Sequence, residues 1–230
     1  MIDIHTHVLP FVDDGSDSYE TSFLMLENSI SQGITDVILT PHFCLGEYQM
    51  DKETLTSEFE KFKSKIAEKD LNVNVYLGQE IFIRKDYKSL FDNQKVVTMN
   101  GTKFVLIEFD TRNDFDIAET VYDLKRLGYE PIVAHVERYS YVDLAIVEEI
   151  KSLGGYIQVN ADSFVGKNKR VYFKKIKELI KNGLVDFVAS DVHDFRDNFM
   201  QKAFEFVAKK FNVQTAEKLF NENAKIIIGG

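Results

Sequence analysis

The five histidines of this sequence all lie at or just after the end of a short apolar run. They are His5, His7, His42, His135 and His193. Each run has the composition of a buried β-strand, and the carboxyl ends of parallel strands can meet at one edge of a sheet or at one mouth of a barrel. Imidazole groups gathered in one place are common ligands of metal ions. The pattern therefore predicts a metal site.

Acidic residues share this placement. They are Asp14, Glu80, Glu108 and Asp191. The pairs His5–His7 and Asp191–His193 have a spacing of two, which places both side chains on one face of a strand. Taken singly, a buried carboxylate often forms a salt bridge, and Asp13 with its neighbour could simply form a turn. Six of seven predicted strand ends carry such a residue, however, and burying several carboxylates without compensation is costly. The joint pattern favours metal binding.

Nine nitrogen and oxygen ligands exceed the roughly four to six positions of one ion, so they suit two or three ions with a bridging carboxylate. Imidazoles and carboxylates without a thiolate favour Mn²⁺, Fe or Zn²⁺. Three divalent ions carry more charge than four carboxylates neutralise, so the site would attract phosphate although the chain has a net charge of −9. Metal clusters of this type generate hydroxide near neutral pH and support in-line displacement at phosphorus.

Arginine placement indicates the same chemistry. Only six of the 28 basic residues are arginines, and four of them follow predicted strands: Arg84, Arg112, Arg138 and Arg196. Guanidinium groups bind phosphate oxygens as a planar fork. Arg138 and Arg196 each stand three residues after a candidate ligand, so we assign them to phosphate binding. Arg84 and Arg112 are interpreted as solvated loop charges.

Strand and helix patterns alternate along the chain. Segments rich in Val, Ile, Leu, Phe and Tyr predict strands at 1–5, 36–41, 74–81, 104–109, 131–135, 156–160 and 187–191. Helical spacing of apolar residues predicts helices at 18–31, 53–68, 116–127, 142–152, 171–181, 198–210 and 214–222. Glycines in the helix-to-strand returns predict left-handed C-caps at Gly33, Gly128, Gly154 and Gly183. This rhythm predicts an α/β fold with a parallel sheet, either open or closed into a barrel, and a barrel would collect all strand ends at one mouth.

Composition excludes several classes of protein. The 230 residues are 44% apolar, which suits a globular chain with one large core or two small ones. No apolar run approaches the roughly 20 residues that span a bilayer, and no basic leader segment precedes the first strand, so we expect a cytoplasmic protein without membrane insertion. The acidic balance argues against nucleic-acid binding. Met50 stands six residues after the single cysteine, Cys44, where a cysteine-based tyrosine phosphatase needs arginine.

The ordered motifs closely resemble those of the polymerase and histidinol phosphatase (PHP) superfamily. Within it, they are most similar to the bacterial metal-dependent protein tyrosine phosphatases associated with capsule and exopolysaccharide synthesis. The resemblance covers nearly the whole chain, which is expected to form a single domain over residues 1–230. The motifs are Met1–His7, Asp13–Gly15, Thr40–His42, Gly78–Ile81, Leu106–Phe109, Ala134–Tyr139 and Ala189–His193.

This resemblance implies a distorted seven-stranded (β/α) barrel of PHP type, with three divalent metal ions at the C-terminal ends of the strands and a preference for manganese. It also implies phosphate binding by Arg138 and, with a shorter segment after His193 than the family pattern, by Arg196. The expected substrate is phosphotyrosine on a cognate tyrosine kinase that regulates polysaccharide export. The ligand sets implied for the three ions are His5, His7, Glu80 and Asp191; Glu80, Glu108 and His135; and Asp14, His42 and His193.

Two other functions stay open at this point. A histidinol-phosphate phosphatase, or another small-molecule phosphomonoesterase of the superfamily, would use the same metal chemistry with a different pocket. A metal-bearing regulatory scaffold without catalysis would be expected to lack a ligand, and none is missing from the sequence. Phe11 and the loop 43–52, with Phe43, Leu45, Tyr48 and Met50, could surround a phenyl ring, which favours phosphotyrosine.

Overall fold

The computed structural model describes residues 1–93, 95–166 and 169–229. Its strands are β1 (Ile2–Thr6), β2 (Asp36–Leu39), β3 (His42–Phe43), β4 (Asn74–Leu77), β5 (Glu80–Phe82), β6 (Phe104–Glu108), β7 (Glu130–Val133), β8 (Tyr156–Asn160) and β9 (Phe187–Ala189). Its α-helices are α1 (Tyr19–Ser31), α2 (Lys52–Glu68), α3 (Lys88–Asp92), α4 (Ile117–Arg126), α5 (Leu144–Ser152), α6 (Asp162–Val165), α7 (Lys169–Lys181), α8 (Met200–Lys210), α9 (Val213–Glu217) and α10 (Lys225–Ile228). Short 3-10 helices, η1 (Met99–Gly101) and η2 (Val136–Arg138), and a π-helix, η3 (Lys218–Glu222), complete the described elements.

The alternating α/β pattern predicted from the sequence is confirmed. Every predicted strand segment overlaps a strand, and every predicted helical range overlaps a helix. The glycines predicted as C-caps all have positive φ, between 67° for Gly183 and 90° for Gly128. This backbone region suits glycine because it has no Cβ atom to clash with the preceding carbonyl group. The short helices α3, α6 and α10 were not predicted.

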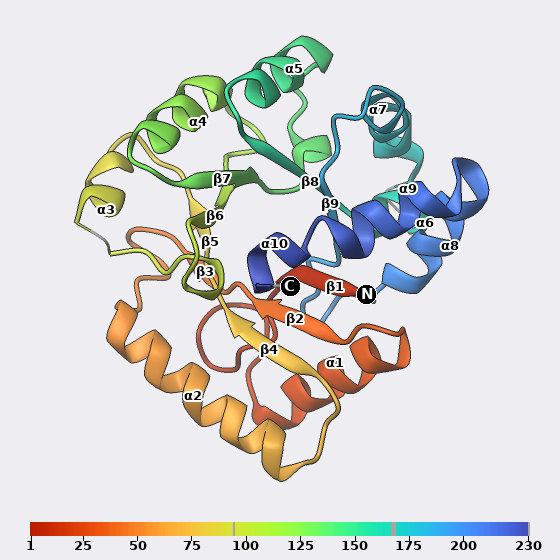
Figure 1. Ribbon diagram of the computed structural model, residues 1–230. Coiled ribbons are helices and arrows are strands. Elements are labelled where there is room, and N and C mark those ends of the chain that lie inside the picture. Colours follow the sequence, from red (N-terminus) through yellow and green to blue (C-terminus); the bar gives the residue numbers. More distant parts are fainter. Residues whose placement is uncertain (94, 167–168, 230) are drawn as a thin grey trace.

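All strand pairs are parallel, and the strands form two sheets. The three-stranded sheet has the order β1-β2-β4, and the six-stranded sheet has the order β3-β5-β6-β7-β8-β9. The sheet curls so that the segment after β9 returns beside β1, where the amide of His7 donates to Val192 O at 3.0 Å and the amide of Asp191 donates to His5 O at 2.9 Å. The helices lie around the outside of the strands (Figure 1). This curl is what brings distant strand ends together.

The described residues form nine strands where the sequence predicted seven, because one predicted strand is divided and another is followed at once by a short extra strand. Segment 36–41 ends as β2, and β3 begins after Pro41; segment 74–81 becomes β4 and β5 on either side of Gly78 and Gln79. Proline has no amide hydrogen for the ladder. A Cβ atom on Gly78 would lie 3.3 Å from side-chain atoms of Ile38 and Thr40, so the chain packs closely where it bends. As a result, His42 and Glu80 lie opposite each other in the β3–β5 pair.

Two apolar clusters hold the fold. The larger one lies between the strands and the surrounding helices. The smaller one is formed by the opposite faces of the strands, including Ile4, Leu106 and Phe187, and Ile227 of α10 also packs in it. In Figure 1, α10 lies over this group of strands, next to the C-terminus. Among the described residues, no helix combines the length and the apolar character needed to cross a membrane.

Candidate metal centre

The nine candidate ligands come together at one end of the curled sheet, although His42 and Glu80 begin short strands there and do not end the preceding ones as the sequence predicted. They lie in β1 and just after it (His5, His7), in the loop before α1 (Asp14), at the starts of β3 and β5 (His42, Glu80), at the end of β6 (Glu108), and after β7 and β9 (His135, Asp191, His193). Eight of them are buried or half-buried, and Asp14 is exposed. The sequence prediction that these residues share one place in the fold is therefore confirmed. Whether each one binds a metal ion stays a prediction.

Glu80 lies at the centre of this cluster. Its Oε2 atom is 3.0 Å from His42 Nδ1, 3.1 Å from His5 Nε2 and 3.2 Å from His7 Nε2. Despite this crowding, Oε2 is buried and makes no hydrogen bond of acceptable geometry to any described residue. His5 Nε2 and His7 Nε2 lie only 3.2 Å apart. Electron pairs that converge without good hydrogen-bond geometry are the arrangement expected around a cation.

The remaining candidates surround this centre. His135 Nε2 lies 3.0 Å from Glu80 Oε1 and 3.4 Å from Glu108 Oε1. Asp191 Oδ1 lies 3.6 Å from the Nε2 atoms of both His5 and His7. Ligand atoms in three sets lie close enough to share an ion: His7, Asp14, His42 and His193; His5, His7 and Glu80; and His42, Glu80 and Glu108. The sets overlap through His7, His42 and Glu80, and of these only Glu80 is a carboxylate, the type of ligand that bridges two ions. They differ from the sets implied by the family motifs, because His135 and Asp191 lie in none of them and His7 and His42 lie in two each.

The electrostatics of the cluster favour positive charge. Although burial and Arg138 oppose protonation, the Glu108 and Glu80 carboxylates raise the pKa of His135 to about 9. Burial likewise opposes ionisation of Glu80, but the His5 and His42 imidazoles lower the pKa of its carboxyl well below the usual range. A carboxylate that stays ionised inside a protein attracts cations of any kind. The residues present therefore fit divalent metal ions.

Local backbone geometry helps to aim these side chains. His135 has φ of 31° and Asp191 has φ of 52°, so both adopt the left-handed conformation that side chains other than glycine rarely adopt. Such strain is frequent at functional sites, where the surrounding structure maintains it. Gly15 lies so close to His7 that a Cβ atom there would overlap the His7 carbonyl group. A glycine at this point allows the Asp14 loop to approach β1.

Sequence analysis missed the role of Asp13. Its buried Oδ2 atom lies 2.7 Å from His7 Nδ1 and accepts the His42 amide at 2.9 Å, while Oδ1 accepts the Gly15 amide at 3.0 Å. Burial opposes ionisation, but the adjacent His7 lowers the pKa of Asp13 to about 2. Asp13 therefore forms the predicted turn and also orients His7, so that Nε2 faces Glu80. The sequence signal was the acidic residue beside a candidate ligand.

Two arginines approach the cluster, as predicted. Arg196 Nη1 donates to Asp191 Oδ2 at 2.6 Å, and Arg138 Nη1 lies 3.5 Å from the same atom. Arg84 and Arg112 are exposed, although Arg84 also donates to Cys44 Sγ at 3.2 Å. Arg138 and Arg196 thus lie beside the cluster, and their role in phosphate binding stays a prediction. The exposure of Arg84 and Arg112 agrees with their interpretation as loop charges.

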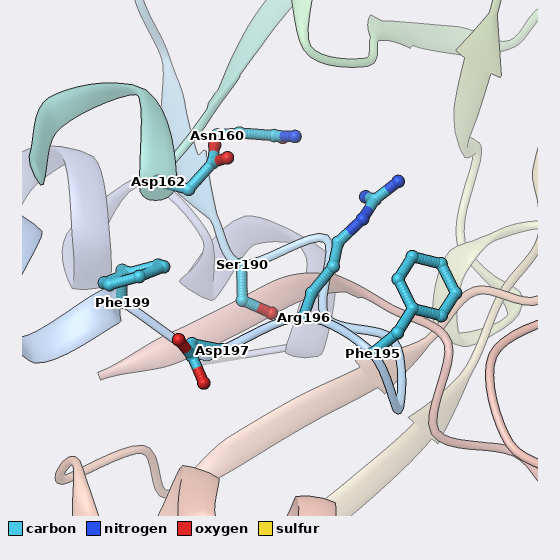
Figure 2. A pocket seen from close by; sticks show the side chains of 7 residues that line it. All are labelled: Asn160, Asp162, Ser190, Phe195, Arg196, Asp197 and Phe199. Atoms are coloured by element: carbon cyan, nitrogen blue, oxygen red, sulfur yellow. The ribbon is translucent and has the colours of Figure 1, made fainter. Parts of the chain in front are cut away.

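A cavity of about 230 Å³ opens beside the cluster. Figure 2 shows the Arg196 side chain extending between Asn160 and Phe195, with Phe199 on another wall. The Phe195 side chain is 65% exposed and its ring lies 5.0 Å from the His193 ring. On the other side, the Tyr48 ring stacks on His42 at 5.8 Å. Aromatic side chains therefore border the site in two places.

The fold and the site together define an α/β protein with a curled parallel sheet and a candidate metal centre at its strand ends. A family model for capsular polysaccharide synthesis proteins, CpsB/CapC, matches residues 1–229. The chain belongs to this family.

Known relatives cover nearly the whole chain. It is 32% identical to tyrosine-protein phosphatase CpsB of Streptococcus agalactiae over 99% of this chain and 98% of that protein. It is 30% identical to tyrosine-protein phosphatase YwqE of Bacillus subtilis over 99% of this chain and 91% of that protein. Among solved structures, one described as YwqE from Bacillus subtilis and CpsB from Streptococcus pneumoniae, unique metal-dependent tyrosine phosphatases, superposes with a TM-score of 0.90 at 28% identity, covering 99% of this chain and 94% of that one.

A more distant structure shares the fold. The lactonase Lmo2620 from Listeria monocytogenes has a TM-score of 0.65 at 12% identity, covering 98% of this chain and 93% of that one.

Proposed function

We propose that this protein is a metal-dependent protein tyrosine phosphatase that hydrolyses phosphotyrosine on a protein substrate. One observation carries the proposal: five imidazoles and four carboxylates converge at the strand ends, with Glu80 Oε2 within 3.2 Å of three imidazole nitrogens and two arginines beside them. The tyrosine phosphatases among the relatives support the choice of substrate. The whole of residues 1–230 acts as one domain, a distorted (β/α) barrel of PHP type with seven β/α units.

Three divalent ions, with manganese as the native metal, bind to the nine candidate ligands. The ligand sets are those implied by the family motifs: His5, His7, Glu80 and Asp191; Glu80, Glu108 and His135; and Asp14, His42 and His193. When bound, the ions supply Lewis acidity and a water molecule acidic enough to lose its proton near neutral pH. Glu80 is the ligand common to two sets, which its central position supports.

The protein side chains carry out the rest of the work. Arg138 and Arg196 bind the phosphoryl oxygens that face away from the metal ions, and both already lie beside the carboxylate of Asp191. Tyr48 and Phe195 contact the phenyl ring of the substrate, because each of them lies against a candidate ligand imidazole at the rim. The protein substrate is a tyrosine kinase of polysaccharide synthesis. A cytoplasmic location stays a prediction of the sequence.

We expect protein purified without chelator to contain more than one transition-metal ion per chain. The reason is that nine ligands exceed what one ion can use. Elemental analysis on protein of known concentration measures the number of ions per chain. Treatment with a chelator should remove both the metal and the phosphatase activity, and Mn²⁺ should restore both. Untreated protein that is fully active with less than one ion per chain would contradict the proposed centre.

Phosphotyrosine peptides should be hydrolysed at least about tenfold more efficiently than phosphoserine peptides of the same sequence. A phenolate, whose conjugate acid has a pKa near 10, is a better leaving group than an alkoxide, and the rim aromatics add contacts with its ring. The measurement is kcat/KM for the two peptides, with histidinol phosphate as a third substrate. Equal values for the two peptides would count against protein tyrosine phosphatase activity, and a preference for histidinol phosphate would favour the small-molecule alternative.

Phe195→Ala should narrow the difference between the two peptides by raising KM for phosphotyrosine alone. Val171→Ala is a matched control, because Val171 is also an exposed apolar side chain, 68% accessible, but lies in α7. The control should leave both peptides unchanged. If Phe195→Ala slows the two peptides equally, the ring contact that we assign to Phe195 is wrong.

A further inference from the structure

Two amide side chains on β8 link candidate ligands that lie on different strands. Gln158 is fully buried and Asn160 is 5% exposed, and neither belongs to the nine candidates. They stand two residues apart, so they point to the same face of the strand. The end of β8 was the one predicted strand end without a candidate ligand. These buried amides therefore call for an explanation other than direct metal binding.

The orientation of the Gln158 amide follows from its partners. Its Oε1 atom accepts the backbone amide of His135 at 2.8 Å, and a backbone N–H can only donate. His5 Nδ1 lies 3.2 Å from the same oxygen, so Nδ1 must carry a proton and donate it. The Nε2 atom of His5 then faces Glu80 Oε2, 3.1 Å away. Gln158 thereby fixes which imidazole nitrogen of His5 is directed toward the candidate metal centre.

The other end of the chain of hydrogen bonds is fixed in the same way. Gln158 Nε2 donates to Asn160 Oδ1 at 2.8 Å, and Asn160 Nδ2 donates to Asp191 Oδ2 at 2.8 Å. An ionised carboxylate can only accept, so each bond has one possible direction from His5 to Asp191. Because Oδ2 is used in this way, Asp191 Oδ1 is left to face the imidazoles of His5 and His7, 3.6 Å from each.

We propose that Gln158 and Asn160 are positioning residues that hold His5 and Asp191 in the orientation needed to bind one and the same metal ion. The inference rests on the proposed metal centre, and it adds an amide relay that orients two of its ligands. Hydrogen bonds from outside the ligand set commonly fix the tautomer and orientation of metal-binding side chains, and their loss weakens metal binding by about 10- to 100-fold. Neither amide contacts the phosphoryl group in the proposed arrangement.

A purely structural role makes a different prediction. If the amides only join β8 to its neighbours, their loss would lower the melting temperature and leave the affinity for metal ions unchanged. If Asn160 serves the cavity of Figure 2, where it lines one wall, its loss would raise KM without changing the metal content. Metal retention at a controlled free metal concentration separates the positioning role from the other two roles, and the melting temperature and KM separate those two from each other.

The experiment compares Gln158→Leu, Gln158→Glu and Asn160→Ala with the wild type. Each protein is loaded with Mn²⁺ and equilibrated in chelator buffers of decreasing free Mn²⁺, and the retained metal per chain is measured together with circular dichroism. Gln158→Leu and Asn160→Ala should each release one ion at about 10- to 100-fold higher free Mn²⁺, while the other ions stay bound. Gln158→Glu keeps an acceptor for His5 Nδ1 and should recover part of the lost affinity.

Asn223→Leu serves as the matched control. Its Nδ2 atom donates to Asp186 O at 2.7 Å, just before β9 and therefore at the opposite end of the strands. This variant loses a partly buried amide hydrogen bond and should retain metal as the wild type does. In the zinc-loaded wild type, nuclear magnetic resonance should detect a slowly exchanging proton on His5 Nδ1, and this proton should exchange faster in Gln158→Leu.

The outcomes distinguish failure of the proposed positioning role of Gln158 and Asn160 from failure of the proposed metal centre. Wild-type metal retention in both Gln158→Leu and Asn160→Ala, or equal weakening in Asn223→Leu, would overturn the relay and leave the proposed function intact. A wild-type protein that retains no Mn²⁺ would instead refute the proposed function. If Gln158→Leu does not fold, Asn160→Ala and Gln158→Glu decide the question, since each of them keeps the bond between position 158 and the His135 amide.

Discussion

Glu80→Ala is expected to abolish phosphatase activity, with a fall in kcat/KM of about 10³-fold or more, and to remove more than one metal ion per chain. The reason is the position of this carboxylate. Its Oε2 atom lies within 3.2 Å of nitrogens of His5, His7 and His42, while its Oε1 atom lies 3.0 Å from His135 Nε2. Loss of a bridging carboxylate disturbs two ions at once. Elemental analysis and steady-state kinetics on one preparation measure both effects.

The fold should survive this change. The apolar clusters lie between strands and helices and below the site, so Glu80→Ala removes none of their side chains. Because Glu80 is paired with buried imidazoles such as His135, its removal should lower the melting temperature without unfolding the protein. Asp186→Asn is the matched control, because Asp186 is also a largely buried carboxylate, paired with Lys151 at 2.6 Å just before β9. The control should lower the melting temperature and keep the metal content. Full activity in metal-replete Glu80→Ala would show that Glu80 is not a bridging ligand.

The gathering of the site could be predicted because parallel strands impose it. Once the apolar segments are recognised as parallel strands, their carboxyl ends face the same edge, and polar residues at those ends must approach one another. The spacing of two predicted a shared face for His5 and His7, which lie in and just after β1. Asp191 and His193 instead lie beyond the end of β9, and the left-handed φ of 52° at Asp191 orients its side chain there, so strand alternation does not account for this pair. Distances of a few ångströms, such as that between His42 Nδ1 and Glu80 Oε2, depend on how the sheet curls. The curl is a tertiary property that no local pattern carries.

The bends of the chain at Pro41 and Gly78 were not predicted, although their causes stand in the sequence. Pro41 and Gly78 lie inside segments that are otherwise apolar and strand-like, and they were treated as parts of strands. In the structure the chain bends at both places, and the bends set His42 opposite Glu80. A proline that cannot donate to the ladder, together with a glycine in close contact, therefore marks a functional bend rather than a defect.

The residues that orient the candidate ligands were not predicted from the sequence. Gln158 and Asn160 repeat the spacing of two seen in His5–His7, on a strand with the sequence YIQVN, but amides are not among the preferred ligands of transition metals. Their signal was burial: polar side chains inside an apolar strand need hydrogen-bond partners. Sequence alone could flag that need, but only the structure identifies the partners as His5 and Asp191.

Arg138→Ala should lower kcat/KM by about 10²–10³-fold, the scale for losing one preorganised donor, while the metal content stays unchanged. Arg138 is the last residue of η2, the short helix that begins directly after His135. Its guanidinium group lies beside the cluster, with Nη1 3.5 Å from Asp191 Oδ2. The nearby Glu108 and Asp191 carboxylates outweigh burial and raise the pKa of Arg138, so the side chain stays charged. A permanently protonated group cannot ligate a cation. What it can do is neutralise phosphoryl oxygens as charge develops on them in the transition state.

Two further variants test this role of Arg138. Arg138→Lys should recover only part of the activity, because a point charge replaces a planar fork with two donors. Arg196→Ala should behave like Arg138→Ala, since Arg196 Nη1 lies 2.6 Å from the same carboxylate oxygen. Arg112→Ala is the control, because Arg112 is exposed in the loop after β6 and should be dispensable. If Arg138→Ala loses metal together with activity, the side chain holds the ligands in place. If it keeps wild-type kinetics, the phosphate must be bound by the metal ions and Arg196 alone.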